Sequence, residues 1–219
     1  MFQSGLLKGK RLAAAVALAL LAAAPGHAAP AKQEPFVHSW QGEFPRTDFS
    51  IYAVPLDQIY DVVHRDGVPA VENPKIVSLR EAYGIGDWEP VVTVSIGGER
   101  RAYPVQLLTW HEIVNDTVGG VPIAVTYSPL CNSIVVYDRR VDGQALVFGE
   151  TGRLRNANAV MYDKETESWW QQYTGEAIVG DLTGKKLRPV AARIESFIRF
   201  RKDAPEGTVV MPRSPSMRQ

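Results

Sequence analysis

The chain has 219 residues and a single cysteine, Cys131, which lies in the turn Ser128-Pro129-Leu130-Cys131-Asn132 between two runs typical of β-strands. A turn can present sulfur to solvent, whereas a cysteine within an apolar strand usually behaves as a small buried hydrophobic residue. Thiolates act as nucleophiles and as ligands of soft or borderline metals. We therefore predict that Cys131 belongs to a reactive-thiol or metal site, with burial as simple core filler as the alternative.

A histidine and a glutamate in the segment Trp110-His111-Glu112-Ile113-Val114-Asn115-Asp116 are candidate partners of this thiol. The order His-Glu suggests a zinc protease, but the required second histidine is replaced by Asn115, a poor zinc ligand, so we reject that interpretation. His111 could accept the proton of Cys131, or the two could bind copper or zinc together. Glu112 is a candidate catalytic residue that could orient the His111 ring.

Aromatic and polar side chains suggest a different function, a non-catalytic module that binds a small molecule or peptide: a glycan, a peptide or a small apolar ligand. In this alternative an aromatic groove holds the ligand and Cys131 is filler. The two adjacent tryptophans of the set could instead simply pack in the core. The candidate ligand-binding residues are Trp110, Asn115, Asp163, Trp169, Trp170 and Gln171, with Tyr173 beside them.

The elements that must position these residues are mostly short strands. Glycine-containing turns at Gly97-Gly98, Gly119-Gly120 and Asp142-Gly143 join β-like runs and are typical of hairpins. Helical spacing occurs in residues 55–65 and again near residues 194–201. We predict a mainly β (α+β) domain of short antiparallel strands, barrel- or sandwich-like, with a few peripheral helices.

The first residues have the pattern of a secretory signal peptide. Lys8, Lys10 and Arg11 precede an apolar run too short to span a bilayer comfortably, and Ala28 offers a cleavage site. We expect a signal peptide at 1–28, an extended segment at 29–54, one globular domain at 55–211 and a flexible tail at 212–219. The product would be periplasmic or secreted, without stable membrane insertion.

The charge balance excludes some partners. The chain has 24 basic and 24 acidic residues, and removal of residues 1–28 would leave 21 basic against 24 acidic ones. This composition provides no basic footprint for nucleic acid. One cysteine also excludes a disulfide within the chain, so Cys131 could exchange disulfides only with a partner molecule.

Long ordered motifs resemble those of the bacterial and archaeal family known as domain of unknown function 3179. The resemblance covers roughly residues 55–211 and rests on the motifs Asp66–Ala70, Arg101–Pro104, Trp110–Asp116, Thr126–Ser133, Met161–Gln172 and Thr174–Ala177. It implies a shared fold but carries no established reaction. Members commonly have Cys-Pro-Leu-Cys at the central turn, whereas this chain has Ser128 in the first position. It therefore lacks the dithiol that a Cys-x-x-Cys pair would supply.

Overall fold

A computed structural model describes residues 35–212, all of which lie in one compact unit. Short strands, nearly all antiparallel, dominate this range, which confirms the predicted mainly β fold class. The expected signal peptide and residues 213–219 of the expected tail lie outside the described residues. None of the helices in the described range is long and apolar enough to cross a membrane.

The strands form three five-stranded sheets, which we call sheets 1, 2 and 3. Sheet 1 has the order β1 (Ile59–Asp61), β11 (Phe148–Arg155), β12 (Asn158–Asp163), β13 (Trp169–Gln171), β14 (Ala177–Val179). Sheet 2 has the order β15 (Arg188–Pro189), β8 (Ser133–Asp138), β7 (Val121–Ser128), β6 (Ile113–Val118), β2 (Val71–Glu72). Sheet 3 has the order β16 (Ala192–Ser196), β4 (Pro90–Ile96), β5 (Glu99–Pro104), β17 (Thr208–Met211), β3 (Lys75–Ser78).

The remaining elements connect or cover these sheets. Pairs β2–β6 and β5–β17 are parallel, and the other pairs are antiparallel. The elements are the hairpin β9 (Arg140–Val141) and β10 (Gln144–Ala145), a 3₁₀ turn (Leu56–Gln58), and the helices α1 (Pro35–Glu43), α2 (Val105–His111) and α3 (Phe197–Asp203).

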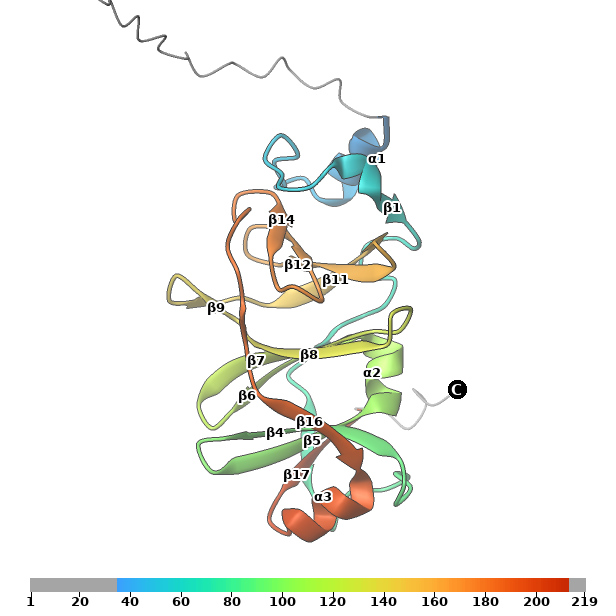
Figure 1. Ribbon diagram of the computed structural model, residues 1–219, viewed down its shortest axis with the longest axis vertical. Coiled ribbons are helices and arrows are strands. Elements are labelled where there is room, and N and C mark those ends of the chain that lie inside the picture. Colours follow the sequence, from blue (N-terminus) through green and yellow to red (C-terminus); the bar gives the residue numbers. More distant parts are fainter. Residues whose placement is uncertain (1–34, 213–219) are drawn as a thin grey trace, which may run out of the picture. The chain divides into compact units, whose positions relative to one another are not determined.

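The sheets stack face to face as layers (Figure 1), and side chains from the facing sheets pack between them. Neighbouring residues of a strand point to opposite faces, so one strand can serve two cores. In sheet 1, Trp169 packs towards α1 while Trp170 packs towards sheet 2, and both are fully buried. The side chains of α3 cover the outer face of sheet 3 in the same way. Strand β12 is buried along its whole length because both faces of sheet 1 are covered.

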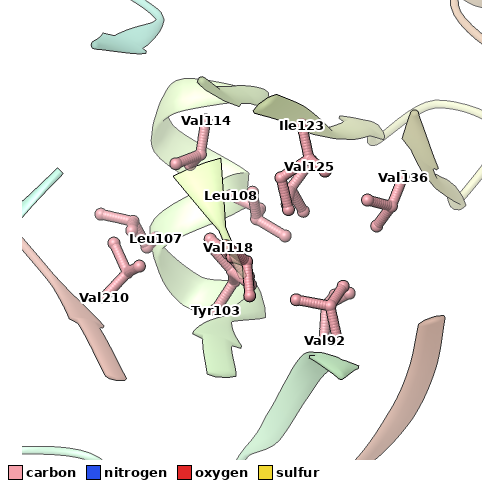
Figure 2. Close-up of a cluster of buried hydrophobic side chains, with 11 residues drawn as sticks. Val92, Tyr103, Leu107, Leu108, Val114, Val118, Ile123, Val125, Val136 and Val210 are labelled. Atoms are coloured by element: carbon pink, nitrogen blue, oxygen red, sulfur yellow. The ribbon is translucent and has the colours of Figure 1, made fainter. Parts of the chain in front are cut away.

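A valine-rich core lies between sheets 2 and 3 and includes the buried side of α2 (Figure 2). Leu107 and Leu108 of α2 contact this core, and β-branched residues of both sheets supply most of the rest. This packing fixes the C-terminal end of α2 against sheet 2. It therefore determines where the next residues, His111 and Glu112, are placed.

Two expectations about local structure need correction. The segment 29–54 was expected to be extended, but residues 35–43 form α1, which buries Trp40 against sheet 1. Residues 55–65 were expected to be helical, but Ile59–Asp61 is strand β1, paired with β11. In both cases tertiary contacts with sheet 1 override local pattern. Near the C-terminus, the predicted helix begins only at Phe197, because residues 192–196 pair with β4.

Candidate functional site

The Cys131 turn closes the hairpin between β7 and β8. Ser128 and Ser133 pair across its base, and Asn132 has a left-handed backbone (φ 49°) that lets the chain reverse. Cys131 is exposed at this turn. Its neighbour Leu130 is 68% exposed, so the sulfur lies beside an open apolar side chain rather than in a closed core.

Polar groups surround the sulfur. The Asn158 amide donates to Cys131 Sγ over 3.2 Å, and Ser133 Oγ lies 3.0 Å from the sulfur. The sulfur is also 3.7 Å from the Ser128 carbonyl oxygen. Burial tends to raise the pKa of the Cys131 thiol, but hydrogen bonds from Ser128, Ser133 and Asn158 outweigh it, so the pKa lies below its usual value.

A buried amide network holds these donors in place. Gln172 Oε1 accepts from both Ser133 Oγ and the Asn158 amide, each over 2.8 Å, and its own amide donates to Thr126 over 2.8 Å. The Gln171 amide donates to Asn158 Oδ1 over 2.6 Å. Because its side-chain oxygen and amide are both engaged, Asn158 is fixed with an N–H directed at the sulfur.

The sequence analysis missed Asn158 and Gln172, which lie 27 and 41 positions after Cys131 in the chain. Their buried polar side chains could have signalled a network, but only the pairing of β12 with β13 brings them together. Gln171 was predicted as a ligand-binding residue. In the structure its amide supports Asn158.

His111 ends α2 and is nearly buried. Its Nδ1 lies 2.7 Å from the Pro69 carbonyl oxygen, which can only accept, so Nδ1 carries a proton and donates to it. No hydrogen bond joins His111 to Cys131 within residues 35–212. The expected thiol–imidazole pair is thus not formed as a direct contact.

A groove beside α2 is lined by Gln106, Leu107, Trp110 and His111 of that helix and by Met211 of β17. Trp110 is 55% exposed there. In this groove an exposed aromatic residue of the predicted ligand-binding set meets an open recess. It contains neither Cys131 nor the other two candidate tryptophans.

Glu112 forms the joint between α2 and β6. Its N–H donates to Leu108 as the helix cap, and its carbonyl accepts from Tyr127 over 2.7 Å as the first bond of sheet 2. The backbone of Glu112 has a positive φ of 55°, a conformation that costs free energy in a residue with a Cβ. It ends the helical direction of α2 at this residue. Burial raises the pKa of Glu112 to about 7.

A carboxyl group that the sequence analysis missed lies near Glu112. Glu150 of β11 is only 3% exposed, and its Oε1 has no hydrogen-bond partner among the described residues. Burial, together with the charges of Glu112 and Asp66, raises the pKa of Glu150 well above its usual value. Nothing in the sequence around Glu150 indicates that its side chain is buried, because the burial depends on the packing of sheet 2 against sheet 1.

The other predicted ligand-binding residues have structural partners. Asn115 bridges sheets 2 and 1, since its amide donates to the Phe148 carbonyl over 2.8 Å and its oxygen accepts from the Phe148 N–H over 2.9 Å. Asp163 accepts from the Trp170 indole over 2.9 Å. Trp169 and Trp170 are both 0% exposed, so they are core residues and do not line a surface groove.

The metal hypothesis lacks a donor set. Within residues 35–212, no group of three or more His, Cys, Asp or Glu side chains lies so as to hold a metal ion. Cys131 is instead surrounded by hydroxyl and amide groups, and His111 bonds a carbonyl. These surroundings do not fit the copper or zinc site that the residue types predicted.

Comparison with known proteins gives the family of the chain. The family model described as "Protein of unknown function (DUF3179)" matches residues 65–219, so the chain belongs to this family, as the motifs predicted. No curated protein and no solved structure matches it.

Proposed function

We propose that this member of the family is an exported protein whose activity depends on Cys131 as a thiolate nucleophile. The observation that carries the proposal is that the Ser133 hydroxyl and the Asn158 amide converge on one exposed sulfur, at 3.0 and 3.2 Å. A thiol needs stabilisation of its anion to react near neutral pH. An inert surface cysteine needs no such support.

The ionisation of the thiol can be followed through these contacts. In the neutral form, Ser133 donates its proton to Gln172, so the thiol S–H can donate to Ser133 Oγ. When the proton leaves, the Asn158 N–H already points at the sulfur, and the Ser133 hydroxyl needs only to turn its proton from Gln172 Oε1 to the sulfur. The thiolate is thus met by one donor already in place and by a second one after a single rotation, an arrangement that favours nucleophilic attack.

The test is the rate at which iodoacetamide alkylates Cys131 in the purified protein at pH 7. Ser133→Ala and Asn158→Ala each remove one contact to sulfur, and we expect alkylation to slow by about tenfold in each. Thr126→Val is the matched control, because it perturbs the same network without touching sulfur. Equal rates in all four proteins, or no alkylation of the folded wild type, would overturn the proposal.

We propose the groove beside α2 as the second candidate function, a site for a small-molecule or peptide ligand. The observation that favours it is the exposed Trp110 next to His111, whose ring is held by its Nδ1 contact with the Pro69 carbonyl. Ligand binding there should quench or shift the tryptophan fluorescence of the wild type but not of Trp110→Ala. A fluorescence change that survives in Trp110→Ala would place the ligand elsewhere.

A further inference from the structure

Strand β16 (Ala192–Ser196) lies at an edge of sheet 3 and pairs with β4 on one side (Figure 1). Within residues 35–212, no second strand pairs with β16, and no loop donates to or accepts from the backbone of residues 192–195. In an antiparallel edge strand, alternate N–H and carbonyl groups point away from the neighbouring strand. The free side of β16 can therefore accept a further strand.

The side chains of β16 alternate between the two faces of sheet 3. Ile194 lies opposite Val92, a residue of the core between sheets 2 and 3, but is itself 63% exposed at the sheet edge. Arg193 and Glu195 point to the other face. The Glu195 carboxylate accepts from Thr93 over 2.7 Å. Arg193 is exposed and has no ion pair or hydrogen bond of its side chain to any other described residue.

The sequence Arg193-Ile194-Glu195 is complementary to itself. Two copies of β16 related by a two-fold axis would pair antiparallel and continue sheet 3 from one copy into the other. Residues that lie opposite each other must then point to the same face of the sheet, which excludes a slip by one residue.

Charge selects one of the remaining registers. A pairing centred on Arg193 or on Glu195 sets two like charges opposite each other, which is destabilising. A pairing centred on Ile194 sets Arg193 opposite Glu195 of the partner subunit, and the same pair forms again on the other side of the axis. Opposite charges then meet at both positions.

We propose that β16 is a homodimer interface, at which two copies of this chain pair their edge strands around Ile194. The two arginine–glutamate pairs fix the register, and the two Ile194 side chains pack together at the axis, with Cβ atoms about 5 Å apart. Arg193 gains a partner, and Ile194 loses its exposure to water. A strand of five residues buries less surface than a permanent dimer needs, so the dimer is reversible, with a micromolar Kd.

This inference is independent of the thiol chemistry proposed for Cys131. The Cys131 turn joins two strands of sheet 2, whereas β16 belongs to sheet 3. The dimer therefore remains testable in Cys131→Ser, a variant that also excludes an intermolecular disulfide as the cause of association.

The experiment is sedimentation equilibrium of the full chain over a range of concentrations. Arg193→Glu sets glutamate against glutamate across the axis, and Glu195→Arg sets arginine against arginine. We expect the Kd of each variant alone to rise by about tenfold or more. A mixture of the two variants has opposite charges at both positions again and should form a heterodimer. Lys202→Glu, the same charge change at an exposed position of α3, is the matched control and should dimerise like the wild type.

Folding of the variants is checked by circular dichroism. Glu195 accepts from Thr93 and lies 3.7 Å from Arg199 Nε, so Glu195→Arg removes contacts within the chain. Arg193→Glu removes no such contact among the described residues. This variant alone therefore decides the question if Glu195→Arg does not fold.

Amide hydrogen exchange locates the interface. We expect exchange in residues 192–196 of the wild type to slow as the protein concentration rises. A wild type that stays monomeric up to millimolar concentration would overturn the proposal. A dimer with the same Kd in Arg193→Glu, or one that leaves exchange in residues 192–196 unchanged, would overturn it in favour of another face.

Discussion

Replacement of Glu112 by glutamine should stabilise the protein, and more so as pH rises. Burial raises the pKa of Glu112 to about 7 from 4.5. A raised carboxyl pKa means that the folded state holds the proton more tightly than the unfolded state. Stability from this group is therefore complete below pH 4.5, is lost as pH rises towards 7, and stays lost above it. Glutamine has no charge to bury and escapes that loss.

The magnitude follows from the pKa shift. One pKa unit corresponds to about 1.36 kcal/mol, so the full shift would give about 3.4 kcal/mol. Glu112 is only half-buried, and solvent screening reduces this value, so we expect a gain of about 1.5 kcal/mol at pH 8. For a domain of this size such a gain raises Tm by about 3–6 °C.

The assay is urea unfolding of wild type and Glu112→Gln at pH 5 and pH 8, with Glu206→Gln as an exposed control. We expect the stability difference between Glu112→Gln and wild type to grow between the two pH values, while the control difference stays constant. A Glu112→Gln difference that is the same at both pH values would refute the view that folding buries this carboxyl at a cost.

Other predictions concern packing and the site. Asn115→Ala should lower the free energy of unfolding by about 2–4 kcal/mol, since the buried Phe148 N–H and carbonyl lose their bridge; urea unfolding measures this, and a loss under 1 kcal/mol would contradict it. Gly149→Ala should destabilise by about 1–3 kcal/mol because its Cβ would meet the Tyr162 ring, whereas Gly42→Ala, in α1 with open space around it, should be neutral or stabilising; similar Tm shifts for the two would argue against this packing. Trp170→Phe should lower the free energy of unfolding, because the buried Asp163 carboxylate loses the indole N–H donor; urea unfolding followed by near-UV circular dichroism measures this. An unchanged free energy of unfolding would contradict the buried position of Trp170.

Local chemistry explains what could be predicted from the sequence. The glycine turn at Gly97-Gly98 joins β4 to β5, and the Ser-Pro-Leu-Cys turn joins β7 to β8, because turn residues act through their own backbone. The exposure of Cys131 follows from the same local geometry. Residue types alone therefore identified the hairpins and the thiol.

What could not be predicted depends on long-range pairing. Asn158 and Gln172 reach the Cys131 turn only because sheets 1 and 2 pack face to face. Glu150 is buried because it points to the face of sheet 1 that packs on sheet 2, and nothing in its own neighbours in sequence indicates this. The same packing gives α1 its buried face, since Trp40 finds its partners on sheet 1.

The most direct test of the central claim is the pKa of the Cys131 thiol, followed as thiolate absorbance at increasing pH in the folded protein. The thiol of an ordinary cysteine has a pKa of about 8.5. Our account predicts a midpoint below that of an ordinary cysteine in the wild type, and a higher midpoint in Asn158→Ala than in the wild type. A wild-type midpoint at or above the ordinary value would contradict the proposal that the surrounding donors prepare Cys131 for nucleophilic chemistry.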